Sequence, residues 1–591
     1  MKRVTLIGAM ISAAIGFIAC GDDSSSANLV EDVSCSSQAV TSSSAKIAGS
    51  SQSALPGSSS RLQSSSDDPP PTSSSEIGYS GSMAGTSSSS KNLAASSSSA
   101  TAKPGSSSAA LANSSSAHAD TTVAKHADTT KITYALKPFK GPLTNPHKGF
   151  TVPTEGTWIF DPAVEYGPYG SLNNKAWDLI TYGSGYQQWN KLNPAKDVYD
   201  WTELDALLEA LAEHGMGYAL RVFPYTPSFI RGNDTPEEEY DWTPKFVYEM
   251  GAKKNTATLK GEGYRAAVPV WDDPIYVQAA KDFGTALAQK YDGDPRIEYI
   301  DIRSFGEWGE WHTSNLDGSE MPSVEIQKDM LKHYASVFKK TQLVLTSDGY
   351  GDVYTYALSL GITKRDDGLI GIPGTADSLV RAYEANLPTI AENMGGYALM
   401  LTYNDIIPGG YLKWTPQRWV DAITTAHLTY YVLDQDSDCG YRFYKENKAL
   451  ADSMVKVIGY NFTVTRAELQ TVTDAAGTTS TLNIAVKNTG VAPCFFDLYM
   501  AAEFVDSTGA ALAQIGKTIR IPKGTFKDES TQEFSFTYKV DSSKSNVATQ
   551  PGVSVALSLY ESEESFKSGK NPTVRFDNDG LLENKKLQLK R

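Results

Sequence analysis

Between residues 131 and 459 the chain alternates short apolar runs with single amphipathic helices, and this pattern restricts the fold more than any other feature. Four leucines from Leu204 to Leu211 recur at helical spacing, and the apolar run 217–223 follows directly. Strands that are apolar on both faces need helices on both sides, as in a parallel sheet. The pattern therefore predicts an α/β domain over residues 131–459.

Eight β/α units can be placed in this region, which fits a (β/α)8 TIM barrel; a doubly wound sheet is the alternative. Helix starts are indicated by Asp273-Pro274, Ser323 and Thr415-Pro416. No glycine-rich phosphate-binding motif follows the first strand, so nucleotide binding has no support. The predicted strands lie at about 149–153, 179–183, 217–223, 297–303, 342–346, 368–372, 388–391 and 428–433.

From residue 460 the pattern changes to strict alternation of apolar and polar residues. Leu482, Ile484 and Val486 place apolar groups on one face of a strand, and the run 534–538 does the same. About seven such strands are predicted over residues 460–591. They indicate an all-β, immunoglobulin-like sandwich after the barrel.

The first twenty residues have the features of an export signal. Lys2 and Arg3 precede an apolar run that ends at Cys20, and the run is too short for a permanent membrane helix. The segment resembles a bacterial lipoprotein signal, which implies lipidation of Cys20 and anchoring in the cell envelope. Gly21, in place of Asp, favours the outer membrane by the same resemblance.

Residues 21–130 are predicted to be a disordered, Ser-rich linker. Serine makes up 37 of the 100 residues from Gly21 to Asp120, and Tyr79 is the one aromatic residue among them. Such a composition buries too little apolar area to offset the entropy of ordering. The linker would hold the folded part away from a membrane.

Charge and cysteine content exclude several classes of function. The net charge of −15 argues against a nucleic-acid partner, which requires clustered basic residues. The four cysteines form no CxxC pair, so no zinc module is expected. Because export leads to an oxidising compartment, we expect Cys439 and Cys494 to form a disulfide. No metal and no cofactor are predicted.

The chemistry is expected where barrel strands end, because active sites of such barrels lie at the carboxyl ends of the strands. The fourth strand runs into a segment, 305–312, with two Glu, two Trp and one His. Glu392 follows the seventh strand. Glycoside hydrolysis needs two carboxyl groups, about 5–5.5 Å apart when the anomeric configuration is retained. Glu310 is predicted to be the acid/base and Glu392 the nucleophile.

Other side chains at the barrel mouth are candidates for substrate binding. Trp308 and Trp311 would stack on sugar rings. Arg221, at the end of the third strand, would point into the barrel and contact substrate or Glu392. The remaining candidates are Glu307, His312, Asp348 and Tyr403.

Several motifs resemble known families. Glu310 and Glu392, with the segments 188–194 and 199–201, are similar to clan A glycoside hydrolases, which implies the catalytic pair named above. Residues 140–591 look closer still to a bacterial family of barrel plus sandwich, domain of unknown function 4832 with its companion 4874. Most clan A members have Asn before the acid/base, where it contacts the sugar 2-hydroxyl; here the residue is Gly309. The three stretches that carry the closer resemblance are 145–150, 308–312 and 488–493.

The sequence thus predicts a lipid-anchored retaining glycoside hydrolase that acts on a poly- or oligosaccharide as a monomer. The alternative is a non-catalytic carbohydrate-binding lipoprotein, which needs the aromatic residues but not both carboxylates. A structural envelope protein is a third class, which would leave the Trp/Glu cluster without a role.

Overall fold

A computed structural model describes residues 127–154, 156, 160, 175–346, 349–404, 411–433 and 440–590. Eight parallel strands form one sheet in the order β2-β12-β11-β10-β9-β7-β4-β3. Bridges from Phe150 to Ile180 and from Pro153 to Ser184 bring β2 beside β3, so the sheet is a nearly closed barrel. The strands are β2 (Gly149–Thr151), β3 (Tyr182–Gln188), β4 (Gly217–Phe223), β7 (Ile297–Ile302), β9 (Gln342–Leu345), β10 (Thr363–Asp366), β11 (Ile390–Ala391) and β12 (Tyr430–Val432).

The sixth barrel strand is not where the sequence predicts it. The apolar segment 368–372 forms turns, and the strand is the polar β10, all four residues of which are buried. Lys364 and Asp366 form an ion pair of 3.0 Å with each other, whereas Arg365 lies on the inward face among carboxylates. The prediction failed because the charged residues of β10 are buried in ion pairs, and a search for apolar runs does not detect such a strand.

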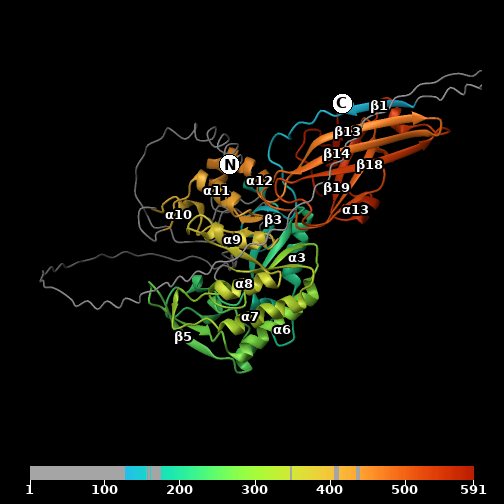
Figure 1. The fold of residues 1–591 in the computed structure, drawn as a ribbon. Coiled ribbons are helices and arrows are strands. Elements are labelled where there is room, and N and C mark those ends of the chain that lie inside the picture. Colours follow the sequence, from blue (N-terminus) through green and yellow to red (C-terminus); the bar gives the residue numbers. More distant parts are fainter. Residues whose placement is uncertain are drawn as a thin grey trace, which may run out of the picture. The chain divides into compact units, whose positions relative to one another are not determined.

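Helices cover the barrel, and α6, α7, α8 and α9 can be followed in Figure 1. Asp273, Ser323 and Thr415 cap α6, α7 and α11 through their side chains, as predicted. The helices are α2 (Trp189–Leu192), α3 (Thr202–Glu213), α4 (Glu237–Tyr240), α5 (Lys245–Glu249), α6 (Pro274–Tyr291), α7 (Val324–Val337), α8 (Gly351–Ser359), α9 (Thr375–Glu384), α10 (Tyr397–Met400), α11 (Pro416–Thr425) and α12 (Tyr441–Val457). Among the described residues, no helix combines the length and apolar character needed to cross a bilayer.

A separate three-stranded antiparallel sheet lies in the long connections of the barrel. It pairs β5 (Lys254–Leu259) with β6 (Arg265–Pro269) and with β8 (Leu316–Asp317). The strand β8 follows the segment 305–312, so this sheet ties that segment to the connection between β4 and α6.

The barrel interior is filled by side chains. Tyr182, Tyr299 and Tyr430 lie inside it with centroid separations of 5.0 to 6.3 Å between their rings. Together with Ala219, Val344 and Ile390 they form a buried cluster of their own. The barrel is therefore a packed core and not a pore, and Arg221, Asp301 and Arg365 lie toward the carboxyl ends of its strands.

Two antiparallel sheets follow the barrel in the same compact unit and share one hydrophobic core. One has the order β1-β13-β14-β18; in the other, β16, β15, β19 and β20 lie side by side and β17 pairs with β15. The immunoglobulin-like strand order stays a prediction. The elements are β13 (Phe462–Asp474), β14 (Gly477–Asn488), β15 (Leu498–Val505), β16 (Ala511–Gln514), β17 (Ile519–Ile521), β18 (Thr531–Asp541), β19 (Ser554–Tyr560), α13 (Glu563–Lys567) and β20 (Leu587–Leu589).

The strand β1 (Asp128–Thr133) pairs with β13, at the far end of the sequence, over six residues. Figure 1 shows this early strand beside β13 and β14. Residues 128–133 therefore belong to a C-terminal sheet, although the sequence pattern assigns them to the linker and to the start of the barrel.

Candidate active site

Arg365 is the centre of a charged network inside the barrel mouth. Its side chain is 1% exposed. Nε lies 3.0 Å from Asp301 and Nη2 lies 2.9 Å from Glu310. Nη1 forms an ion pair with Glu392. One guanidinium thus contacts carboxylates that follow or belong to two different strands, which its planar fork of five donors allows.

Glu310 follows β7 and lies at the end of the short 3-10 turn η4 (Glu307–Gly309). Arg303 Nη1 lies 3.0 Å from its Oε1, and His312 Nε2 lies 3.6 Å from its Oε2. Burial alone would raise the pKa of Glu310, but Arg303, His312 and Arg365 together hold it below its usual range. The Glu310 carboxyl is therefore ionised in this arrangement.

Glu392 directly follows β11, and its backbone fixes the ends of two strands. Its N–H donates to the Asp366 carbonyl at 2.8 Å, and its carbonyl accepts from Leu369 at 3.1 Å. Arg221, which points inward from β4, donates to its Oε2 at 3.3 Å. Glu392 and Glu310 therefore share one cation, Arg365, and each has a second arginine of its own.

The structure brings Glu310 and Glu392 together. One carboxylate oxygen of each lies within 4.8 Å of the other, and an oxygen of Asp367 lies within the same distance of both. Asp367 is absent from the sequence prediction because it follows β10, whose polar residues give no apolar strand signal. Burial, with Glu310 and Glu392 nearby, raises the pKa of Asp367 to about 7 against the opposing effect of Arg365.

The segment that carries Glu310 has an unusual backbone. Trp308 and Trp311 have φ of 50° and 62°, and Gly306 and Gly309 also have positive φ. Such values are rare for bulky residues and are found mostly where a site is held in a strained conformation. A Cβ on Gly309 would lie 2.5 Å from Arg303 Cβ and 2.6 Å from its carbonyl oxygen. An Asn in this position, as in most clan A members, would clash with Arg303.

Trp311 is not a stacking platform, contrary to the prediction. Its residue is 3% exposed, its ring packs edge-on against Phe305 at 5.2 Å, and its Nε1 donates to the Ile302 carbonyl. The indole of Trp311 is therefore part of the packing within the segment 305–312. Trp308 remains partly exposed, and its Nε1 donates to Ser228 at 2.9 Å.

Glu307 was predicted to bind substrate, but it is completely buried and cannot reach a substrate in this conformation. Its carboxylate accepts from the backbone N–H and the side-chain amide of Asn315 at 2.8 and 2.7 Å. Burial raises its pKa. Glu307 therefore holds the segment 305–312 to the residues before β8. His312, in contrast, lies between Glu307 and Glu310, 3.6 Å from a carboxylate oxygen of each.

The remaining predicted residues are Tyr403 and several that lie outside the described part of the chain. Tyr403 is half-buried after α10, with its ring 5.3 Å from that of Tyr411. Asp348 and Cys20 lie outside the described residues. Cys494 is a buried thiol, and its predicted partner Cys439 lies outside the described residues, so the disulfide stays a prediction.

Glu310, Asp367 and Glu392 have the spacing of a cation site, but Arg365 already forms ion pairs with two of these three carboxylates. The network thus contains its own cation. The absence of a metal, expected from the sequence, stays a prediction.

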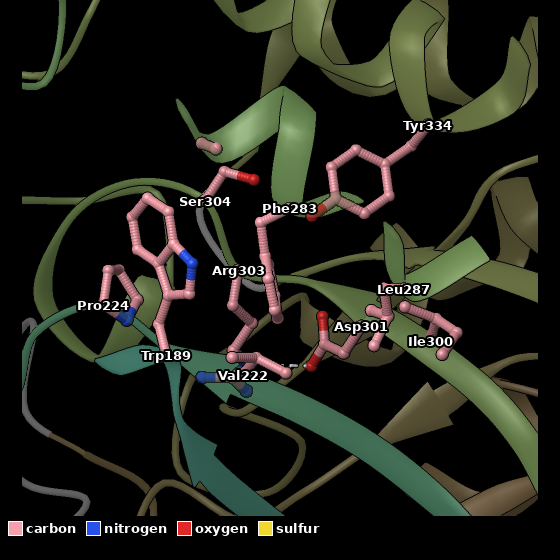
Figure 2. Close-up of a pocket in the computed structure, with 11 residues that line it drawn as sticks. Trp189, Val222, Pro224, Phe283, Leu287, Ile300, Asp301, Arg303, Ser304 and Tyr334 are labelled. Carbon is pink, nitrogen blue, oxygen red and sulfur yellow. Dashed lines mark hydrogen bonds and ion pairs between the residues drawn. The ribbon is translucent and has the colours of Figure 1, made fainter. Parts of the chain in front are cut away.

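A pocket lies beside the carboxylate network, and Figure 2 shows the side chains that line it. It lies mainly among apolar residues of β4, β7, α6 and α7, such as Val222, Phe283 and Tyr334. Asp301 and Arg303 belong to both the pocket and the network. None of the three clustered carboxylates lines this pocket.

Residues 177–309 match the family model Glyco_hydro_42, described as beta-galactosidase. The match covers β3, β4 and β7 and ends directly before Glu310. It supports glycoside hydrolase activity for the barrel. No curated protein sequence matches the chain.

Three enzymes are among the solved structures to which this chain is similar. A beta-galactosidase from the psychrophilic Marinomonas ef1 is 13% identical with a TM-score of 0.31, over 52% of this chain and 60% of that one. Xylanase 10B from Thermotoga maritima is 10% identical with a TM-score of 0.31, over 52% and 96%. A GH27 β-L-arabinopyranosidase from Geobacillus stearothermophilus is 10% identical with a TM-score of 0.27, over 68% and 98%. The chain thus spans about 60% of the Marinomonas enzyme.

Proposed function

We propose that this protein is a retaining glycoside hydrolase that acts on a poly- or oligosaccharide, with Glu392 as the nucleophile. The observation that carries the proposal is the approach of carboxylate oxygens of Glu310 and Asp367 to within 4.8 Å of one from Glu392 at the barrel mouth. Retention requires two carboxyl groups about 5–5.5 Å apart, whereas inversion requires about 6.5–9.5 Å to admit a water. The family-model match over residues 177–309 supports the same class of reaction.

The substrate class is proposed from the same match. Beta-galactosides are the first substrates to test, since the matching family model is described as beta-galactosidase. The exposed part of Trp308 would stack on a sugar ring, and His312 would contact a hydroxyl group near Glu310. The closer resemblance to domain of unknown function 4832 remains part of this proposal.

Nuclear magnetic resonance of the products tests the mechanism. The full chain is incubated with aryl β-galactosides and, for comparison, aryl xylosides and arabinopyranosides. We expect the first product to have the anomeric configuration of the substrate. A product of opposite configuration would exclude the retaining mechanism, and no hydrolysis of any glycoside or polysaccharide would exclude the enzyme.

The alternative, a carbohydrate-binding protein without activity, is favoured by one observation. Arg303 and Arg365 hold Glu310 as a carboxylate, which cannot protonate a leaving group. Affinity measurements distinguish the two functions. Binding of glycans by wild type and by Glu392→Gln with equal affinity, and hydrolysis by neither, would favour the binding protein.

We also propose that Cys20 is lipidated and anchors the protein in the outer membrane, with the residues from 21 to the start of β1 as a spacer. The basic residues Lys2 and Arg3 and the apolar run before Cys20 support this. Metabolic labelling with a palmitate analogue should modify the wild-type chain and leave Cys20→Ala unlabelled. Equal labelling of both, or of neither, would contradict the anchor.

A further inference from the structure

Three arginines and four carboxyl groups share the barrel mouth. Arg221, Arg303 and Arg365 are paired with Asp301, Glu310 and Glu392, and every one of these three carboxylates contacts at least one guanidinium. The arginine charges therefore balance three carboxylates. The fourth carboxyl group is that of Asp367.

Asp367 has a different environment from the other three. Within the described part of the chain its carboxyl group has no hydrogen bond and no ion pair, although the residue is partly buried. Its neighbours are carboxylates, since an oxygen of Glu310 and one of Glu392 lie within 4.8 Å of its own. A fourth negative charge here would face two others without a cation in contact, which a bound proton avoids.

The charged groups around Asp367 agree with this geometry. Glu310, after β7, and Glu392, after β11, both raise its pKa, as does Asp366 beside it on β10; Arg365 opposes them. The Asp367 pKa of about 7 differs from the lowered pKa of Glu310. Two carboxyl groups whose pKa values are pushed apart in this way are expected to divide the acid and the anionic roles of a glycosidase.

We propose that Asp367, and not Glu310, is the general acid/base of the site. The proposal rests on the proposed glycosidase function. Glu392 attacks the anomeric carbon, the glycosidic bond breaks, and its electron pair stays on the leaving oxygen, which takes the proton of Asp367. Water then attacks the same carbon, gives a proton to Asp367, and releases Glu392. Glu310, held by Arg303 and Arg365, positions the sugar as a fixed anion.

The test compares Asp367→Asn with Glu310→Gln, each with azide and with aryl and alkyl glycosides. An acid/base variant loses most activity on poor leaving groups, and azide restores its turnover by attacking the glycosyl-enzyme without a base. We expect Asp367→Asn to lose roughly a hundredfold to ten-thousandfold on alkyl glycosides and far less on dinitrophenyl glycosides. Azide should form a glycosyl azide with this variant alone.

Asp329→Asn is the matched control, because its largely exposed side chain pairs with Lys281 between the outer helices α7 and α6 and lies outside the network. It should keep the leaving-group dependence of wild type. The proposal is overturned if Glu310→Gln shows the azide rescue and Asp367→Asn does not. Wild type without any hydrolysis would instead contradict the proposed function.

Infrared titration of the full chain gives a measurement that does not depend on activity. We expect a protonated carboxyl band that disappears as the pH rises through about 7 and is missing in Asp367→Asn. A band that persists unchanged in this variant, or no band that titrates near pH 7, would overturn the assignment of the proton to Asp367.

Discussion

The two ends of the barrel hold their buried charges in different ways. At the carboxyl end, three arginines are distributed over carboxylates that follow β7 and β11, on a backbone with four positive φ values between residues 306 and 311. At the amino end, His147 lies between Glu298 and Glu561, 2.8 and 3.0 Å from them. Tyr430 donates to the same Glu298 at 2.9 Å.

The comparison indicates which end of the barrel has acidic groups that are not balanced by cations. Glu298 contacts His147 and accepts a hydrogen bond from the Tyr430 hydroxyl, and His147 also contacts Glu561, so these interactions join the barrel to the following sheets. The carboxyl end contains one acidic group more than its arginines balance. An excess of this kind costs stability and leaves a group free to exchange a proton, which a structural ion pair does not.

The largest expected effect is a loss of activity at the carboxyl end of the barrel, whereas the matching change at the amino end should affect stability alone. Glu392→Gln should lower kcat/KM by roughly a thousandfold or more on every substrate, because the nucleophile is lost. Glu298→Gln should leave kcat/KM unchanged but lower the free energy of unfolding by about 1–3 kcal/mol, since a buried hydrogen bond to a charged group is weakened. Kinetics and urea denaturation of both variants measure this. Similar activity losses in both would remove the distinction between the ends.

Arg365→Met should be the most destabilising change in the network. It leaves Asp301, Glu310 and Glu392 with fewer cations in a buried site, and breaking such pairs costs about 3–5 kcal/mol. Arg221→Met, which removes a single contact to Glu392, should cost about 1.5–3 kcal/mol. Chemical denaturation compares the two. Equal losses would show that Arg365 has no central role.

The two tryptophans of the segment 305–312 should differ as much as the two ends of the barrel do. Trp311→Ala removes a buried ring and should cost about 3–5 kcal/mol of unfolding free energy. Trp308→Ala should leave the unfolding free energy within about 0.5 kcal/mol, as for surface changes, and raise KM if the ring stacks on sugar. Thermal unfolding and substrate titration test both. A stable Trp311→Ala variant with raised KM would restore the platform role.

The smallest effect concerns the pH dependence of the amino end. The carboxylates of Glu298 and Glu561 outweigh burial and raise the pKa of His147 above 6.5. A raised folded pKa adds stability that is complete below the unfolded pKa of about 6.5 and is lost as the pH rises through the folded value. His147→Gln should therefore cost about 1–2 kcal/mol at pH 5.5 and less at alkaline pH.

Urea denaturation at several pH values measures this difference, with Glu392→Gln as a control that keeps the His147 contacts. A cost of His147→Gln that grows with pH would show that the histidine is neutral in the folded protein.

Much of the barrel follows from apolar periodicity, but two strands were misplaced. β3 lies at Tyr182–Gln188 and not at 179–183, because most of its residues are Gly, Ser and Gln, which give no apolar signal. The strands β4, β7 and β9 are apolar and lie within a residue or two of their predicted positions. β10 was missed because its buried residues are Thr, Lys, Arg and Asp, whose partners come from other strands. No local pattern reports such tertiary pairing.

The candidate site was predicted only in part. Glu310 and Glu392 were proposed because they follow apolar strands, and the structure brings them together, while their roles stay a prediction. Asp367 was missed because the strand before it was missed. Trp311 was misplaced because its indole is part of the packing within the segment 305–312, and sequence composition does not report that packing.

Tension on the chain ahead of Asp128 reaches the folded part first through β1. Six paired residues, from Asp128–Thr473 to Thr133–Glu468, hold this strand to β13. Asn145 and Arg575 add two mutual hydrogen bonds before the chain enters β2. A pulling force from that side would thus act first on the pairing of β1 with β13. The barrel would keep its geometry until the force was large enough to separate these two strands.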